Sequence, residues 1–333
     1  MSPPAKIRFA SRAYDGVLPI LHGQLKIPGV ELEITEMEDV AGMFAGMFKG
    51  RFDIGEMSLG ELIYYTSRGR ADFTAVPVFP SRMFRHGFIF CRKDSGIETP
   101  ADLSGRKIGF LRWVQTAAIW MRGMLVEEYG VSSRDSEWHV ASMHHWDDAD
   151  PGAGVEPRDG TMIRMISGEG STSERACGAL FDGRLDALGV TESQLGTLLA
   201  NGSVKRLFKN PREVEARYYR STRILPIMHV LALRRELAEA QPDLPENLFR
   251  VYCEAKRWAQ NWRRAIPSLA EAWTNQYLSE EREIFQSDPW VYGLEQNRHV
   301  LDKFLGYCHT QGISARRLAA TELFHPRTLT LNE

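Results

Sequence analysis

The sequence predicts an α/β protein built from two lobes. Its 333 residues exceed what one hydrophobic core usually organises, and its 43% hydrophobic and 25% charged residues are typical of a globular chain. Strand-like and helical segments alternate from residue 6 to residue 79, as in a parallel sheet covered by helices. The same alternation begins again at Lys107, so we expect a second α/β lobe.

The elements of the first lobe follow from the spacing of apolar side chains. In residues 30–35, Val, Leu and Ile alternate with Glu and Thr, as in a half-buried strand. In residues 40–48, Val, Met and Phe recur at helical intervals, and Gly50 stands where a left-handed cap is common. The predicted strands are 6–10, 30–35, 52–57 and 73–79, and the predicted helices are 17–21, 40–48 and 58–65.

The second lobe is expected to follow an apolar run at 88–92. Residues 142–173 are rich in Gly, Pro, Asp and His and show no period, which predicts a long loop or an inserted excursion. The apolar run 224–234 predicts a further strand, and a long amphipathic helix follows it. The other expected elements are strands 107–111 and 185–190, helices 117–125 and 174–182, a helix from Thr191 or Glu192, and further helix through Leu305.

Charge and cysteine content exclude several classes of protein. The 41 Lys and Arg nearly balance the 43 Asp and Glu, so no overall field recruits nucleic acid or an anionic membrane. Four cysteines without CxxC spacing favour reduced thiols over disulfides or a zinc site. The first residues lack the pattern of a secretory signal, and no apolar run is long enough to span a membrane. We therefore expect a cytoplasmic protein, and a homo-oligomer is left open.

Three stretches resemble the type II periplasmic binding protein fold. FIFCRKDSGIETPADLSGRKIGF, from Phe88, is similar to its first crossover, and GALFDGRLDALGV, from Gly178, to the segment before the ligand loop of the second lobe. VLALRRELAEAQPDLPENLFRVYCEAKRWAQ, from Val230, is similar to the return crossover and its helix. The resemblance implies two crossover strands and a ligand cleft between the lobes. Lobe 1 would comprise residues 1–88 and 231–333, and lobe 2 residues 89–230.

Three motifs together resemble the 4,5-dihydroxyphthalate decarboxylase family, an enzymatic branch of that fold. They are FPSRMFRHGFIF, VQTAAIWMRGMLVEEYG and YYRSTRILPIMHV. The resemblance implies removal of one carboxyl group from a hydroxylated aromatic diacid, giving a catechol carboxylate without an organic cofactor. The second candidate function is that of a solute-binding protein that captures a small aromatic acid without turnover. A cytoplasmic ligand sensor is a third, but the sequence shows no basic DNA-binding helix.

Such a decarboxylation needs a general acid for the ring carbon, an acceptor for the phenol proton and cations for the carboxylates. Histidine suits the first role, since its unperturbed pKa is about 6.5. His86 and His229 lie on the two proposed crossovers. We predict His86 as proton donor and His229 as phenol acceptor or second acid, with exchange of the two roles left open. Each could instead satisfy a hydrogen bond in the hinge.

Substrate contacts are predicted at arginines and at the carboxyl ends of strands, where α/β proteins bind ligands. The guanidinium fork suits carboxylates, whereas Ser58 and Thr116 could donate hydrogen bonds or only cap helices. Glu56 and Glu192 could orient a histidine, accept the hydroxyl proton or be ordinary solvated carboxylates. The predicted substrate contacts are Arg82, Arg85, Arg112, Arg12, Arg223, Ser58, Glu56, Thr116 and Glu192.

One cluster raises the question of a metal. Imidazole and carboxylate groups gather at His144, His145, Asp147, Asp148 and Asp150, where the family resemblance leads us to expect a glycine-rich turn. Adjacent histidines in a loop do not reproduce a defined ligand spacing. We therefore predict no metal and no cofactor, and leave metal binding by this loop open.

Overall fold

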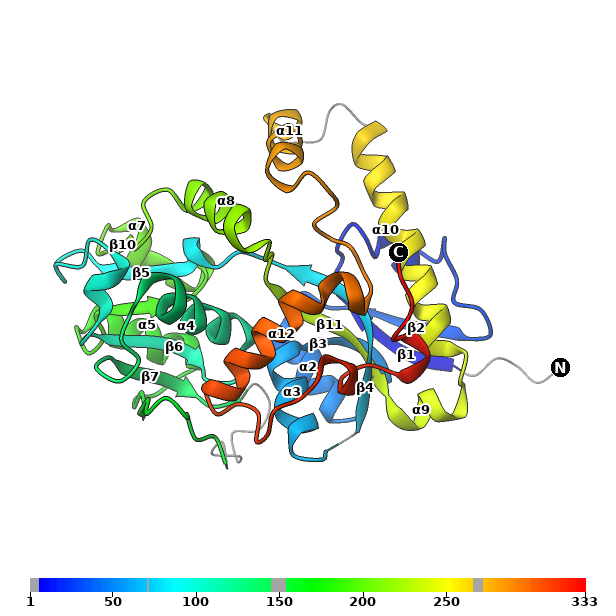
Figure 1. The fold of residues 1–333 in the computed structure, drawn as a ribbon, viewed down its shortest axis with the longest axis horizontal. Helices are drawn as coiled ribbons and strands as arrows, with labels where there is room; N and C mark the ends of the chain where they lie inside the picture. Colours follow the sequence, from blue (N-terminus) through cyan, green and yellow to red (C-terminus); the bar gives the residue numbers. More distant parts are fainter. Residues whose placement is uncertain (1–5, 71, 145–153, 266–271) are drawn as a thin grey trace. The chain divides into compact units, whose positions relative to one another are not determined.

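The computed structural model describes residues 6–70, 72–144, 154–265 and 272–333. The chain divides into two compact units: unit 1 comprises residues 1–82, 219–302 and 319–333, and unit 2 residues 83–218 and 303–318. Each unit contains one β-sheet with helices around it (Figure 1). The predicted α/β class with two sheets is confirmed.

Unit 1 is organised around a five-stranded sheet in the order β2-β1-β3-β11-β4. Strand β1 pairs in parallel with β2 and β3, whereas β11 is antiparallel to both of its neighbours. The strand carboxyl ends of β1, β3 and β4 therefore lie at the edge where β11 begins. The strands are β1 (Lys6–Ser11), β2 (Glu31–Glu36), β3 (Ile54–Ser58), β4 (Phe73–Arg82) and β11 (Ile227–Arg234).

The helices of unit 1 form where the apolar spacing predicts them. In α2, the Asp39 side chain caps the helix by accepting from the Ala41 amide, and Met43, Phe44 and Met47 are buried. The helices are α1 (Leu18–Leu21), α2 (Val40–Phe48), α3 (Leu59–Ser67), α9 (Arg235–Ala240), α10 (Leu244–Ala265) and α11 (Thr274–Phe285), with 3₁₀ turns η3 (Ala320–Glu322) and η4 (Pro326–Thr328).

Unit 2 carries a six-stranded mixed sheet in the order β10-β5-β9-β6-β7-β8. The predicted strand at 88–92 corresponds to β5, which pairs with β9 and β10 in this sheet. The strands are β5 (Ile89–Arg92), β6 (Lys107–Arg112), β7 (Glu137–Ser142), β8 (Ile163–Met165), β9 (Ala187–Gly189) and β10 (Val204–Arg206). Strand β8 corrects the prediction of a loop over 142–173: it has only three residues and exposes two of them, so it carries no apolar pattern.

The helices of unit 2 centre on α4, whose residues 116–125 are all buried. Trp120 stacks on Phe304 at 5.0 Å, which explains why residues 303–318 belong to this unit although lobe 1 was expected to contain them. The helices are α4 (Thr116–Tyr129), α5 (Thr172–Phe181), α6 (Glu192–Leu195), α7 (Thr197–Ala200) and α8 (Pro211–Thr222), with 3₁₀ turns η1 (His86–Phe88) and η2 (Pro100–Leu103). Helix α12 (Leu294–Thr310) contributes to both units.

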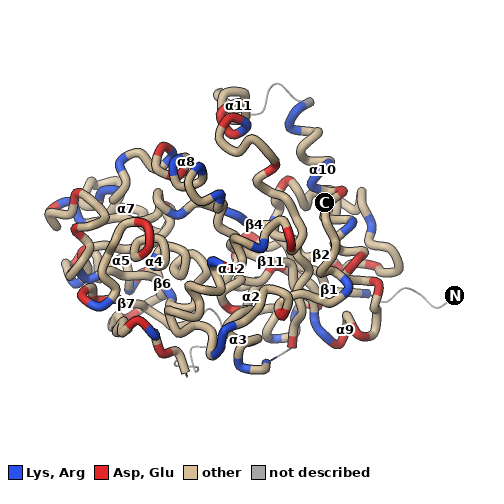
Figure 2. The backbone as a smooth tube through the Cα atoms, viewed as in Figure 1, with Lys and Arg blue, Asp and Glu red and all other residues tan. Residues whose placement is uncertain are grey.

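The predicted lobe boundaries and the two units do not coincide. Residues 83–88 belong to unit 2 and residues 219–230 to unit 1, because the unit boundaries lie after Arg82 and before Tyr219. Basic and acidic residues are interspersed along both units (Figure 2). Within the described ranges, no helix is both long and apolar enough to cross a membrane.

Candidate functional site

Glu56 is the centre of a polar cluster in unit 1. It lies in β3 with a fully buried side chain. Its Oε1 accepts hydrogen bonds from Ser11 Oγ and from the Arg12 backbone amide, each at 3.1 Å. Its Oε2 lies 3.1 Å from Nδ1 of His229. A buried carboxylate needs such donors, because leaving it unpaired would cost several kcal/mol.

His229 is held by this carboxylate and by an aromatic ring. A carboxylate accepts hydrogen bonds, so Nδ1–H of His229 donates to Glu56 and Nε2 is the nitrogen left for chemistry. The Phe44 ring stands edge-on to the imidazole, with centroids 5.1 Å apart. The side chain of His229 is 16% exposed, whereas Glu56 is 0% exposed. The imidazole is therefore oriented by a buried group and still accessible.

Two tyrosines border the same carboxylate. Burial and the charge of Glu56 raise the pKa of the Tyr14 phenol, and burial and the same charge raise that of Tyr252 in α10. Both phenols therefore stay protonated at neutral pH and can only donate or accept hydrogen bonds as neutral groups. The Arg12 guanidinium lies 5.7 Å from the centre of the Tyr14 ring.

The sheet explains why these groups meet. Ser11 ends β1, Ser58 ends β3, and Ser81 precedes the last residue of β4. His229 lies opposite Ser58 on one side and Ser81 on the other. The pairing of these strands thus brings the predicted residues Glu56, Ser58 and His229 together, and Arg12 contributes its backbone amide. This agrees with the rule that α/β proteins bind ligands at the carboxyl ends of strands, called the strand-end rule below. Ser58 holds the N-cap position of α3, but its side chain makes no capping hydrogen bond.

Sequence reasoning did not select Ser11, Tyr14 or Tyr252. Ser11 ends β1 and Tyr14 follows three residues later, so the rule that ligands bind at the carboxyl ends of strands was the available signal. Tyr252 lies 23 residues or more from any other member of the cluster and occupies an amphipathic helix, where it is indistinguishable from a core residue.

His86, the predicted proton donor, is enclosed within unit 2. Its side chain is 1% exposed, and the rings of Tyr129, Phe208 and Tyr218 lie 5.2–5.9 Å from its centroid. Neither ring nitrogen has a hydrogen-bond partner among the described residues. Burial lowers the pKa of His86 to about 4, so the imidazole is neutral near pH 7. These surroundings favour a packing role, and the catalytic role stays a prediction.

The other predicted contacts of unit 2 lie at separate positions. The Arg85 guanidinium lies 5.1 Å from the Phe88 ring, and Arg112 ends β6 opposite Ser142. Thr116 is buried as the first residue of α4, so it is not the N-cap, which is Gln115. Glu192 forms an exposed ion pair with Arg206. Substrate binding by these four residues stays a prediction.

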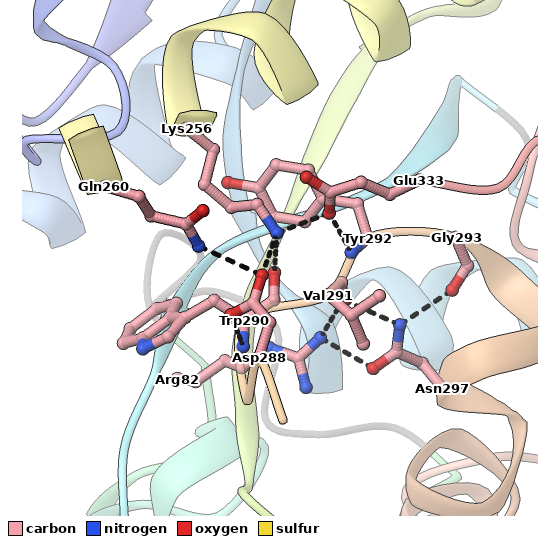
Figure 3. A network of polar contacts seen from close by, with 10 residues as sticks. All are labelled: Arg82, Lys256, Gln260, Asp288, Trp290, Val291, Tyr292, Gly293, Asn297 and Glu333. Atoms are coloured by element: carbon pink, nitrogen blue, oxygen red, sulfur yellow. Dashed lines mark hydrogen bonds and ion pairs between the residues drawn. The ribbon is translucent and has the colours of Figure 1, made fainter. Parts of the chain in front are cut away.

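Arg82 and Arg223 lie in unit 1 and line one pocket. Arg82 Nη2 donates to the Val291 carbonyl at 2.8 Å and to Asn297 Oδ1 at 2.6 Å (Figure 3). His229 packs against α2, whereas Arg82 bonds to α12 and the segment before it. In the sheet, Arg82 lies opposite Ile227, two positions before His229. Substrate binding by Arg82 and Arg223 stays a prediction.

Most of the cluster that raised the question of a metal lies outside the described residues. Among the described residues, no group of three or more His, Cys, Asp and Glu side chains is placed to hold a metal ion. Of the predicted cluster, only His144 is described, and it is buried; His145, Asp147, Asp148 and Asp150 lie outside the described residues. The four cysteines are free, and burial raises the pKa of Cys91 to about 12, which disfavours a thiolate.

Comparison with known proteins decides the family. The chain is 34% identical to a 4,5-dihydroxyphthalate decarboxylase of Comamonas testosteroni over 324 residues, which are 95% of each protein. The chain belongs to the 4,5-dihydroxyphthalate decarboxylase family. This family shares its fold with binding proteins, since residues 10–256 match the family model described as ABC transporter, phosphonate, periplasmic substrate-binding protein.

Solved structures confirm the family's fold. The alkanesulfonate-binding protein SsuA from Xanthomonas axonopodis pv. citri, bound to MOPS, superposes with a TM-score of 0.55 at 16% identity, over 98% of this chain and 99% of that one. The desulfurization enzyme DSZB superposes with a TM-score of 0.54 at 16% identity, over 97% of both chains. The periplasmic-binding-protein fold expected from the sequence is confirmed, and it serves binding proteins and enzymes alike.

Proposed function

We propose that this protein decarboxylates a hydroxylated aromatic carboxylic acid, such as 4,5-dihydroxyphthalate, without an organic cofactor. The observation that carries the proposal is the Glu56–His229 pair, in which a buried carboxylate orients a partly exposed imidazole. Membership of a family with a decarboxylase relative 34% identical over 95% of the chain supports it. A general acid–base group held in one orientation is what this reaction needs.

His229 is the proposed proton-handling residue. With Nδ1–H bound to Glu56, Nε2 can donate a proton when the ring is cationic and accept one when it is neutral. The ring carbon that carries the carboxylate gains a proton while the phenol loses one. The bond to the carboxyl carbon then breaks, its electron pair restores the aromatic ring as a phenolate, and carbon dioxide leaves. The phenolate then takes up a proton. Overall, one carboxylate is replaced by one proton.

Glu56 is proposed as a positioning residue. Its second oxygen is occupied by Ser11 Oγ and the Arg12 amide, so the carboxylate cannot rotate freely. A fixed carboxylate selects the Nδ1–H tautomer and holds the imidazole in one orientation. The tyrosines at positions 14 and 252 supply neutral hydroxyls beside the same carboxylate.

Solute capture without turnover is the competing function, because residues 10–256 match a family model of transporter binding proteins. The experiment that separates the two is incubation of the purified protein with 4,5-dihydroxyphthalate, with and without a chelator, followed by measurement of carbon dioxide and of the monoacid product. We expect release of both in equal amounts. Tight binding without release of carbon dioxide or product would contradict decarboxylation and favour solute capture. Loss of release only with chelator would overturn the prediction that no metal takes part.

A further inference from the structure

Unit 1 contains a cationic pocket that the proposed reaction does not use. It has a volume of about 270 Å³ and is lined by residues of β4, the end of α8 and its following turn, the 287–291 segment and α12. Arg82, Arg223 and His299 give it basic groups, with Tyr219 and Gln296 beside them. A pocket of this size suits a small acid rather than a large ligand.

Arg82 is the unusual group of this pocket. Its side chain is 95% buried, since only 5% of it is exposed, yet no carboxylate of the described residues lies within 4.0 Å of its guanidinium. Only Nη2 has acceptors, the neutral oxygens of Val291 and Asn297, and Nε is buried without a partner in the described chain (Figure 3). A buried cation whose hydrogen-bond acceptors are all neutral is costly, so an anion in the pocket would stabilise it.

The acidic residues nearby are already paired. Asp288 and Glu333 both accept from the Lys256 ammonium, and Asp288 also accepts from the Gln260 amide at 3.0 Å (Figure 3). Asp288 lines the pocket, but its charge is directed to Lys256, at 2.5 Å. These carboxylates therefore lower the cost of burying Arg82 at longer range without occupying its hydrogen-bonding positions.

Arg223 supplies the second cation. Its backbone is in the left-handed conformation, which is rare for residues other than glycine. Its φ is +57°, and its carbonyl accepts a hydrogen bond from His299 Nε2 at 2.9 Å. The exposed Arg223 guanidinium has no carboxylate partner among the described residues and lies 5.7 Å from the Tyr219 ring. A non-glycine residue in the left-handed region costs free energy, so the surrounding contacts must hold the chain there.

We propose that this pocket is a binding site for a small oxyanion, held by Arg82 and Arg223. The chemistry fits a carboxylate group, which can accept two parallel hydrogen bonds from a guanidinium, and an inorganic oxyanion of similar size. The carboxylate would come from an organic acid, and the inorganic oxyanion would be free sulfate. The proposal concerns anion binding alone, so it holds whether or not the bound anion is the substrate of the decarboxylation.

The test is calorimetric titration of the whole protein with sodium sulfate and, separately, with phthalate, at constant ionic strength. Phthalate carries two carboxylates and no hydroxyl, so neither probe is expected to react. The informative variant is Arg223→Asn, because asparagine tolerates the left-handed backbone and removes the charge. Arg220→Gln is the matched control, since Arg220 is an exposed arginine of α8, the helix just before Arg223, and does not line the pocket.

We expect at least one anion to bind wild type, and Arg223→Asn to weaken that binding about tenfold or more while Arg220→Gln leaves it unchanged. Arg82→Gln should abolish binding, and if it does not fold, Arg223→Asn still decides. Sulfate alone as ligand would identify the inorganic oxyanion as occupant, whereas phthalate binding displaced by sulfate would identify an organic acid. Absence of binding by both probes, or equal affinities in wild type and Arg223→Asn, would overturn the proposal. Since no turnover is required, the result does not depend on decarboxylation.

Discussion

Oε2 of Glu56 lies 3.1 Å from Nδ1 of His229, although the two residues are 173 positions apart in the chain. The antiparallel pairing of β3 and β11 brings them together, because Leu231 lies opposite Glu56 and His229 opposite Ser58. The pair is thus a diagonal neighbour contact across two strands, a position within reach of long side chains. Its geometry depends on strand register, not on a flexible loop.

Replacing His229 by Asn should remove proton handling while keeping a donor for Glu56. We expect turnover of 4,5-dihydroxyphthalate to fall by about 10²- to 10⁴-fold, the usual contribution of a general acid–base group. The matched control is His22→Asn, an exposed histidine of the same unit, which should keep full turnover. Equal rates for the two variants would remove His229 from the mechanism.

Replacing Glu56 by Gln should disturb the orientation of His229 without removing it. The amide keeps one acceptor for Ser11 and Arg12 but leaves the histidine without its carboxylate. We expect kcat to fall by about 10²-fold or more with little change in KM, because orientation matters most for the reacting step. Steady-state kinetics separates the two constants. A variant with wild-type kcat and only reduced thermal stability would show that Glu56 is structural.

His86 should make the protein acid-sensitive. Its pKa in the folded state is about 4, below the ordinary 6.5, so the unfolded chain binds the extra proton between these values. Stability from a neutral His86 is therefore fully present above about pH 6.5 and is lost as pH falls toward 4, by about 3 kcal/mol in total. Urea unfolding at pH 7 and pH 4 measures it: His86→Leu should gain about this much relative to wild type on acidification.

The same His86→Leu variant also tests the role first predicted for this residue. Packing among Tyr129, Phe208 and Tyr218 implies that turnover survives the substitution at neutral pH. A folded variant that binds substrate but has lost turnover would restore His86 as proton donor. His22→Leu is the control for the pH dependence, because an exposed histidine should not change it.

Replacing Gly123, where α4 meets α12 in unit 2, should destabilise the protein. A methyl group there would overlap the ring of Tyr307, which is held by its hydroxyl at Glu127 Oε2, 2.5 Å away. We expect Gly123→Ala to cost about 1–3 kcal/mol of unfolding free energy. Gly178→Ala in α5 is the matched control: nothing lies within 4 Å of the added methyl group, so it should gain about 0.5–1 kcal/mol. Equal effects on thermal unfolding would contradict this account.

The fold was largely predictable because its elements carry strong local patterns. The Met and Phe stripe of α2 and the alternation in β2 both appear where periodicity placed them. The three-residue strand β8 was missed, since exposed edge strands need no apolar side chains. Membership of residues 303–318 in unit 2 depends on contacts such as Trp120–Phe304, which no local pattern contains.

The site was predictable only in part. The strand-end rule indicated the loop after β1 and the end of β3, where Glu56 and its hydrogen-bond donors lie. The sequence could not separate His229 from His86, because both lie on the proposed crossovers, whereas their side chains are 16% and 1% exposed. Nor could it show that Arg82 would be buried against Asn297, 215 positions later in the chain.

The interior position of β11 has a consequence for the order in which the protein is made. Strand β4 pairs within its sheet only with β11, so it leaves the ribosome without a partner until residue 234 has been synthesised. All six strands of the other sheet, at 89–206, emerge during that interval and can pair first. The sheet begun first is therefore completed last, and a nascent chain that ends before β11 has Glu56 but no histidine beside it.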